Sequence, residues 1–307
     1  MAITFQGLAL GGMTFAQQPP NQYAIFGYGT TATVTAITNL VSNTGVVAND
    51  TTGVGTARYK LAAAGYGTGS AIFGYGYSPA VQSMTNKVSI TGVVATDTTG
   101  VGTARGGIAA AGYGTDKAIF GYGSTTGGAA SVSLTNLVSN TGVVGNDVAG
   151  VGTTRSNLAA AGYGTDKAIF GYGQASQVTS ITNLVSNTGV VATDTTGVGT
   201  QRSDLAAAGY GGDKAIFGYG LDFNTTAQSI TNKVSNTGVV ATDTIGVGTA
   251  RCVIAAATYG YDKAIFGYGF SGTYLSITNL VSNTGVVATD TTGVGTARNS
   301  IAASSYN

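Results

Sequence analysis

The chain consists of six near-copies of one segment, and this repetition constrains its fold more than any other feature. Each copy of AIFGYG is followed by a version of SITNLVSNTGVVATDTTGVGTAR and then by a version of LAAAGYGTD. Tandem copies fold by packing similar units against one another, so we predict one repeat domain over residues 20–307, preceded by an N-terminal arm over residues 1–19. The motif recurs every 47 to 50 residues, beginning at Ala24, Ala71, Ala118, Ala168, Ala215 and Ala264.

Each unit contains four short segments with the character of β-strands, typified by LAAAGYG, KAIFGYG, SITNLVS and GVVATD. Turn sequences rich in Gly, Asn, Asp and Thr separate them. Four strands in a unit of this length are typical of a propeller blade, and the small residues of LAAAGYG suit the crowded strand nearest the axis. We therefore predict an all-β fold, a six-bladed β-propeller with four-stranded blades.

The two ends of the repeat region complement each other. The first unit begins at its second strand, QYAIFGYG, and the sequence ends with a lone first strand, NSIAASSYN. Pairing of this last strand with residues 23–29 would complete the first blade and close the ring, leaving no exposed sheet edge. The segment ITFQGLALGG is an alternative for this place, but it lacks the Arg and the spacing of the other copies.

These motifs resemble the kelch repeat, in which an Arg precedes a small apolar strand and the second strand ends in a glycine pair. The resemblance covers residues 20–307 and implies a propeller. It departs from the family pattern at Gly121-Tyr122-Gly123, where the glycine pair is interrupted, and at Val143, where the family has Trp. The near-identity of the copies and the Ser, Thr, Asn and Gly bias are also similar to repeat proteins of bacteriophage virions.

The composition leaves few groups for catalysis or metal binding. The chain has no His and no Trp, its 12 acidic residues are all Asp, and its only Cys, Cys252, is expected to pack as a small apolar residue. We therefore expect no catalytic residues, no metal and no cofactor. One Arg and one Asp recur in every unit, and we expect a structural ring in which each Arg binds carbonyl groups or the Asp carboxylate at a blade junction; a carboxylate ring that binds a cation at the axis is the alternative. This set comprises Arg58, Arg105, Arg155, Arg202, Arg251 and Arg298, with Asp50, Asp97, Asp147, Asp194, Asp243 and Asp290.

All length variation between the units lies in the connection between the second and third strands. In a propeller these connections emerge on one face, and variable loops on a rigid scaffold commonly form a binding surface. Drift at tolerated surface turns is the alternative explanation. Four aromatic residues in these loops are candidate ligand contacts for a sugar ring or a protein partner: Tyr77, Phe223, Phe270 and Tyr274.

These features predict a non-catalytic structural or binding propeller, most consistent with a bacteriophage virion component that acts in assembly or host attachment. The expected partners are other virion proteins, through the arm, and a host surface glycan or receptor. A lectin-like adhesin, secreted or on the cell surface, is one alternative, and a propeller enzyme such as a lyase or glycosidase is another. A net charge of +1 argues against nucleic-acid binding, and no apolar run reaches the roughly 18 residues that span a membrane.

Overall fold

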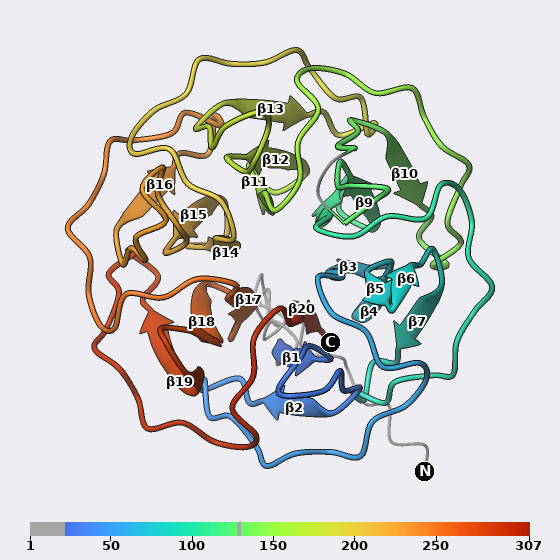
Figure 1. Ribbon diagram of the computed structural model, residues 1–307, viewed down its shortest axis with the longest axis horizontal. Coiled ribbons are helices and arrows are strands. Elements are labelled where there is room, and N and C mark those ends of the chain that lie inside the picture. Colours follow the sequence, from blue (N-terminus) through green and yellow to red (C-terminus); the bar gives the residue numbers. More distant parts are fainter. Residues whose placement is uncertain (1–21, 128–129) are drawn as a thin grey trace, which may run out of the picture.

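The computed structural model describes residues 22–127 and 130–307. These residues form strands, turns and loops, without a helix among them. Six three-stranded antiparallel sheets surround a common axis as six blades (Figure 1). The all-β class is confirmed, and the arrangement is compatible with a β-propeller.

In every blade the middle strand pairs with an inner strand near the axis and with an outer strand. From the inner strand outward, the first three blades are β20 (Ala302–Tyr306), β1 (Tyr23–Gly27) and β2 (Thr38–Val41); β3 (Ala62–Tyr66), β4 (Ser70–Gly74) and β7 (Thr85–Val88); and β8 (Ala109–Tyr113), β9 (Lys117–Gly121) and β10 (Thr135–Val138). The last three are β11 (Ala159–Tyr163), β12 (Lys167–Gly171) and β13 (Thr182–Val185); β14 (Ala206–Tyr210), β15 (Lys214–Gly218) and β16 (Thr231–Val234); and β17 (Ala255–Tyr259), β18 (Lys263–Phe270) and β19 (Tyr274–Val281). A small ribbon of β5 (Tyr77–Ser78) and β6 (Ala80–Val81) projects from the second blade.

The prediction of four strands per blade was wrong, because the GVVATD segment makes only isolated bridges to the outer strand. A side chain interrupts the ladder between them. In the first blade, Asn39 of β2 donates from Nδ2 to the carbonyl oxygen of Ala48 (3.0 Å) and to the Asp50 carboxylate (2.8 Å), in place of a regular backbone pair. The register shifts by one residue across this point, as the flanking bridges Val41–Val47 and Thr38–Thr51 indicate.

The hydrophobic core lies between blades and not at the axis. One of its clusters joins Ile119 and Tyr122 of the third blade to Leu158 and Phe170 of the fourth. The Tyr122 and Phe170 rings meet edge to face, with 5.1 Å between their centroids. A Cβ at Gly121 would lie 2.6 Å from the Phe170 ring, so the glycine at the end of the middle strand leaves room for the aromatic ring of the next blade.

The predicted pairing of the last strand with the first is present. β20 pairs antiparallel with β1, from Tyr23 opposite Tyr306 to Gly27 opposite Ala302. The rings of Tyr23 and Tyr306 stack with centroids 5.8 Å apart. β20 thus occupies in the first blade the place that β3 holds in the second.

Backbone hydrogen bonds connect consecutive blades at both ends of the axis. At the end where the inner strands finish, the amide that follows each inner strand, from Gly in five blades and from Asn307 in the first, donates to the residue at the Asp position of the next hairpin. Six bonds complete this lower ring: Gly67 to Asp116, Gly114 to Asp166, Gly164 to Asp213, Gly211 to Asp262, Gly260 to Gln22, and Asn307 to Gly69. The last two bonds use residues from the two ends of the described chain.

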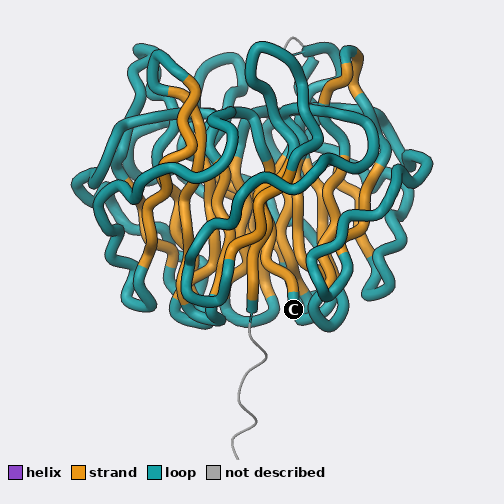
Figure 2. The backbone as a smooth tube through the Cα atoms, turned by 90° about the horizontal axis from the view of Figure 1, so that it is seen from below, coloured by secondary structure: helices purple, strands orange, loops and turns teal. Residues whose placement is uncertain are grey.

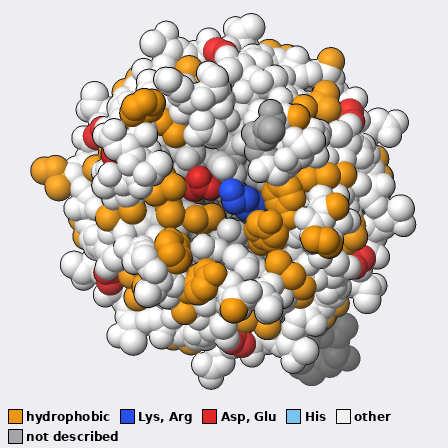
Figure 3. All heavy atoms as spheres, viewed as in Figure 1, with side chains coloured by type: hydrophobic (Ala, Val, Ile, Leu, Met, Phe, Trp, Pro, Cys, Tyr) orange, Lys and Arg blue, Asp and Glu red, His pale blue; other side chains and the backbone are white. Residues whose placement is uncertain are grey.

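Figure 2 shows the ring from its side, with the C-terminus on the lower face. We call the opposite face, which Figures 1 and 3 view, the upper face. The predicted arm over residues 1–19 lies outside the described residues. Within the described ranges, no helix is long and apolar enough to cross a membrane.

Candidate functional site

The variable connections all lie on the upper face, because each follows the end of a middle strand that begins at the lower turn, beside the C-terminus. They differ in form as well as in length. The second blade carries the β5–β6 ribbon, and in the sixth blade β18 and β19 extend to eight residues each. By contrast, the lower turn between the outer strand and the GVVATD segment reads SNTGVV in five units and SITGVV in the second.

A second set of unit-specific residues lies beside these loops. The two residues that follow the repeated Arg read YK, GG, SN, SD, CV and NS in the six units. The first residue of each pair forms a β-bridge with the first residue of its own blade's variable loop, as between Tyr59 and Tyr77. Sequence reasoning missed this set, although its variation within an otherwise repeated motif was a visible signal.

The second residue of each pair belongs to an upper ring of backbone hydrogen bonds around the axis. Each amide donates to the carbonyl of the equivalent residue in the preceding blade: Lys60 to Ser300, Gly107 to Lys60, Asn157 to Gly107, Asp204 to Asn157, Val253 to Asp204, and Ser300 to Val253. All six have φ between 51° and 62°, the left-handed region that favours glycine. The closed set of bonds holds even the β-branched Val253 there, at a cost of about 1–3 kcal/mol.

Two charged side chains of the upper ring meet at the mouth of the axis. Lys60 in the second blade and Asp204 in the fifth approach to 3.6 Å between Nζ and Oδ1. The Lys60 ammonium also donates to Asn157 Oδ1 at 3.3 Å. Figure 3 shows a hollow at the centre of this face, with a basic and an acidic group beside each other. The ammonium is therefore held by partners from two other blades.

A cavity of about 420 Å³ opens beside this mouth, lined by residues of the second, third and fourth blades. We call it the upper cavity. Its lining includes Tyr59, Lys60, Tyr77, Val81, Ser156 and Asn157. Most of these are unit-specific residues, so this lining differs in sequence from the corresponding positions of the other blades.

The aromatic part of the upper cavity comes from Tyr59 and Tyr77. Their ring centroids lie 5.3 Å apart, with 32° between the planes. Tyr77 is buried, and burial raises the pKa of its phenol above the ordinary value, although a hydrogen bond with Ser124 opposes this effect. Tyr59 is half-buried. The pair forms a fixed aromatic wall in a protein whose other core aromatics lie between blades.

The structure distributes the four predicted aromatic residues over three loops. Tyr77 lines the upper cavity. Phe270 and Tyr274 contact each other in the β18–β19 hairpin, with ring centroids 5.7 Å apart. Phe223 is 61% exposed on the fifth blade. All four lie on the variable loops of the upper face, but they do not form a single cluster.

Each repeated Arg is fully buried at a blade junction. In the second blade, Arg58 lies over the Tyr28 ring of the first blade, 4.7 Å from its centroid. Its guanidinium donates to Asn86 Oδ1 (2.7 Å) and to the carbonyl oxygens of Thr56 (3.2 Å) and Tyr75 (3.0 Å). Carbonyl and amide oxygens thus accept hydrogen bonds from most of its N–H groups. A guanidinium can be buried when its donors are paired in this way.

The Asp that approaches each Arg comes from the following unit, not from the same one. Arg58 lies 3.5 Å from Asp97, and Asp50 instead accepts hydrogen bonds from Thr296, near the opposite end of the chain. Burial raises the pKa of Asp97, but hydrogen bonds from Thr56 and Asn86 outweigh it and hold the pKa below the ordinary value. These carboxylates lie beside the outer strands, away from the axis. Over the described ranges, no group of three or more His, Cys, Asp or Glu side chains could hold a metal ion.

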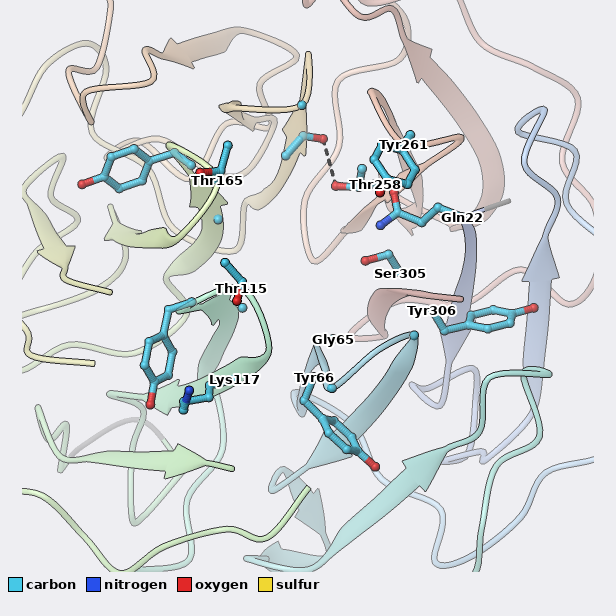
Figure 4. A pocket seen from close by; sticks show the side chains of 18 of the residues that line it. Gln22, Gly65, Tyr66, Thr115, Lys117, Thr165, Thr258, Tyr261, Ser305 and Tyr306 are labelled. Atoms are coloured by element: carbon cyan, nitrogen blue, oxygen red, sulfur yellow. Dashed lines mark hydrogen bonds between the residues drawn. The ribbon is translucent and has the colours of Figure 1, made fainter. Parts of the chain in front are cut away.

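A second cavity, of about 430 Å³, lies on the axis at the lower face (Figure 4). Its walls come mainly from repeated positions, such as Gly65, Thr115 and Lys117. The Lys117 ammonium forms an ion pair with the adjacent Asp116 at 2.8 Å. Because successive blades contribute equivalent groups, we attribute this cavity to the convergence of the inner strands.

Cys252 is buried and pairs with Phe270 at the base of the sixth variable loop. Burial raises the pKa of its thiol to about 11. The thiolate needed for reaction is therefore scarce at neutral pH, in line with a packing role.

No protein-family model and no curated protein sequence matches this chain.

Proposed function

We propose that the chain is a closed, kelch-like six-bladed β-propeller that acts as a non-catalytic binding scaffold, with the upper face as its recognition surface. One observation carries this proposal: the residues that distinguish the units gather on one face, around the mouth of the axis and the upper cavity. A scaffold of repeated blades supplies rigidity, and its loops supply specificity.

The distribution of differences argues against drift as the sole cause. Surface turns on both faces tolerate substitution, so drift alone would vary the lower turns as well. The lower SNTGVV turns are nearly invariant among the units, and the lower turn after each inner strand keeps its length and changes at few positions, such as Tyr261. The upper loops, by contrast, differ in length and in almost every residue. The upper ring even retains a lysine and a valine in left-handed backbone, where glycine would cost less. This pattern supports retention of particular side chains on the upper face.

The setting that we propose is a bacteriophage particle, in line with the compositional similarity to virion repeat proteins. In this proposal residues 1–19 bind other virion proteins, and the upper face binds a glycan or receptor on the host surface. Gln22, the first described residue, lies on the lower face. Attachment and recognition would then use opposite faces. A secreted or cell-surface adhesin would use the upper face in the same way.

Paired substitutions taken from the chain's own repeats test the role of the upper face. Replacing Tyr59 with Ser and Lys60 with Gly installs residues that other blades carry at the same positions, Ser156 and Gly107. Tyr261→Thr on the lower face is the matched control, because Thr115 and Thr165 hold the equivalent place. The fluorescently labelled full chain should bind to a panel of bacterial cells, and the upper-face double variant should bind at least about tenfold less, a loss of about 1.4 kcal/mol.

The control variant should bind as well as the wild type. Circular dichroism should first show that the wild type, the double variant and Tyr261→Thr are all folded. Unchanged cell binding by the double variant would then reject the upper face as the recognition surface. If only Tyr261→Thr lost cell binding, the recognition surface would be the lower face and not the upper one.

A further inference from the structure

The upper cavity combines an aromatic wall with a polar rim. Tyr59 and Tyr77 form the wall, and Val81 adds an apolar side chain from the β5–β6 ribbon. The third and fourth blades contribute Thr125 and Asn157 to the same lining. An apolar surface facing a few fixed polar groups is typical of a small-molecule site.

The polar groups offer both donors and acceptors. Asn157 accepts a hydrogen bond from Lys60 through Oδ1, which leaves the hydrogens on Nδ2 for a ligand. The Thr125 hydroxyl donates to the carbonyl oxygen of Ala130 (3.3 Å), so it can accept from a ligand. The Ser156 hydroxyl accepts from Ser131 Oγ (3.5 Å) and keeps its own hydrogen for donation. A ligand that matches this rim carries several groups of the same mixed kind, and hydroxyl groups are the simplest of these.

The charge of the cavity favours a neutral ligand. Its only cation among the described lining residues is Lys60, and Asp204 lies 3.6 Å from that ammonium. The side chain of Asp204 is only 14% exposed, so solvent screens this pair weakly. An anionic ligand would have to compete with a carboxylate that is already in place.

Backbone geometry disfavours an extended peptide at the aromatic wall. Tyr59 and Tyr77 already exchange both backbone hydrogen bonds, from Tyr77 N to Tyr59 O (2.9 Å) and from Tyr59 N to Tyr77 O (3.2 Å). A peptide that adds as a strand needs such groups unpaired. The volume of about 420 Å³ is also near the lower end of the 300–1,000 Å³ that is usual for ligand sites, which suits a compact ring.

We propose that the upper cavity binds a neutral saccharide. One pyranose ring packs its C–H face against Tyr59, while its hydroxyl groups exchange hydrogen bonds with Asn157, Lys60 and Thr125. This inference rests on the proposed function, because it assigns a ligand class to the recognition surface.

Titration of the full chain with methyl glycosides of glucose, galactose, mannose and N-acetylglucosamine tests the inference, with saturation-transfer NMR and calorimetry as readouts. At least one glycoside should bind with a dissociation constant on the order of 1 mM, as expected for a ligand of this size. Tyr59→Ser and Asn157→Gly should each weaken that binding at least about tenfold. Both substitutions occur naturally in the repeats, at Ser156 and Gly107, which limits the risk of misfolding.

Tyr59→Phe should retain binding, since stacking requires the ring and not the hydroxyl group. Tyr261→Thr serves again as the folded control and should bind like the wild type. Binding that survives both Tyr59→Ser and Asn157→Gly would place the sugar elsewhere and overturn the inference. Tighter binding of methyl glucuronide than of methyl glucoside would overturn the preference for a neutral ligand.

The saccharide inference and the proposed function can fail separately. If no glycoside binds at about 20 mM, the saccharide assignment is wrong. If the upper-face double variant still loses cell binding in that case, the upper face remains the recognition surface, but its ligand belongs to another chemical class. If cell binding is also unchanged, both proposals fall.

Discussion

Deleting residues 299–307 should destabilise the whole protein and not only its end. The deletion removes β20, so β1 loses its inner partner and the first blade exposes a sheet edge. It also removes Ser300 from the upper ring of hydrogen bonds and Asn307 from the lower one. Between the first and second blades, side-chain packing, the linking segment and the hydrogen bond from Gly29 N to the Arg58 carbonyl oxygen (2.9 Å) would remain.

The size of the effect follows from the buried side chains of the deleted segment. Ile301 and Tyr306 are each 6% exposed. Ile301 packs against the sixth blade, and Tyr306 packs against the second. Truncating one large buried side chain costs about 2–5 kcal/mol, so losing both costs about 4–10 kcal/mol before the lost backbone hydrogen bonds are counted. A typical domain is stable by only about 5–15 kcal/mol in total. We therefore expect the midpoint of thermal unfolding to fall by more than about 10 °C.

Differential scanning calorimetry of the full and shortened chains measures this change. Two single substitutions calibrate it: Ile301→Ala in the first blade and Leu158→Ala at the equivalent place in the fourth, where the side chain is 5% exposed. If β20 completes the first blade as β11 completes the fourth, the two variants should lose similar stability. A synthetic peptide of residues 296–307 added to the shortened chain should restore part of the lost stability.

A midpoint within about 2 °C of the full chain would refute the reasoning, because this corresponds to about 1 kcal/mol or less. Loss of stability for Leu158→Ala without loss for Ile301→Ala would show that the last strand contributes little to the first blade.

Three further predictions concern the repeated framework. Arg155→Lys should lower the free energy of unfolding, measured by urea denaturation, by about 2–4 kcal/mol, because lysine cannot both stack on Tyr122 and reach the bonded oxygens. Unchanged stability together with loss of partner binding would instead assign the repeated Arg residues to recognition. The native pKa of Asp97 is depressed, so its contribution to stability is fully present above its unfolded pKa of about 3.9 and is lost as the pH falls through the native pKa. Asp97→Asn should therefore weaken the decline of stability below about pH 4 in denaturation curves measured from pH 7 to pH 2, and an identical decline would contradict this. Gly121→Ala should cost about 1–3 kcal/mol, since its Cβ would meet the Phe170 ring at 2.6 Å, and thermal melts equal to the wild type would show that the ring can shift freely.

The sequence allowed the sheets, their number and the pairing of the two ends to be predicted. The strands follow from periodicity within each unit, and the number of sheets and the pairing of the two ends follow from comparison of the repeated units. The fourth strand was not predictable in this way. GVVATD has strand-like composition, but Asn39 and its counterparts direct a side-chain amide into the ladder, and only the three-dimensional contact decides between the two kinds of hydrogen bond.

The candidate site was predicted in part. The variable loops and Tyr77 were predicted from a comparison of the units. The ion pair of Lys60 with Asp204 was not, because its two residues are far apart in sequence. The Arg and Asp pairs illustrate the same limit, because the partner of Arg58 is Asp97 of the following unit and not the Asp nearer in sequence. Spacing alone cannot distinguish a contact within a blade from one between blades.

The pairing of β20 with β1 has a consequence for how the protein is made. A ribosome synthesises Tyr23 long before Tyr306, so the first sheet cannot be completed until the strands of the other five blades have been translated. During that time β1 offers an unpaired edge, and the inner strands of the other units carry almost the same sequence as its true partner. Strand exchange within one nascent chain, or between neighbouring chains on a polysome, competes with correct pairing. Slow synthesis and high expression should therefore favour misassembled oligomers over monomers.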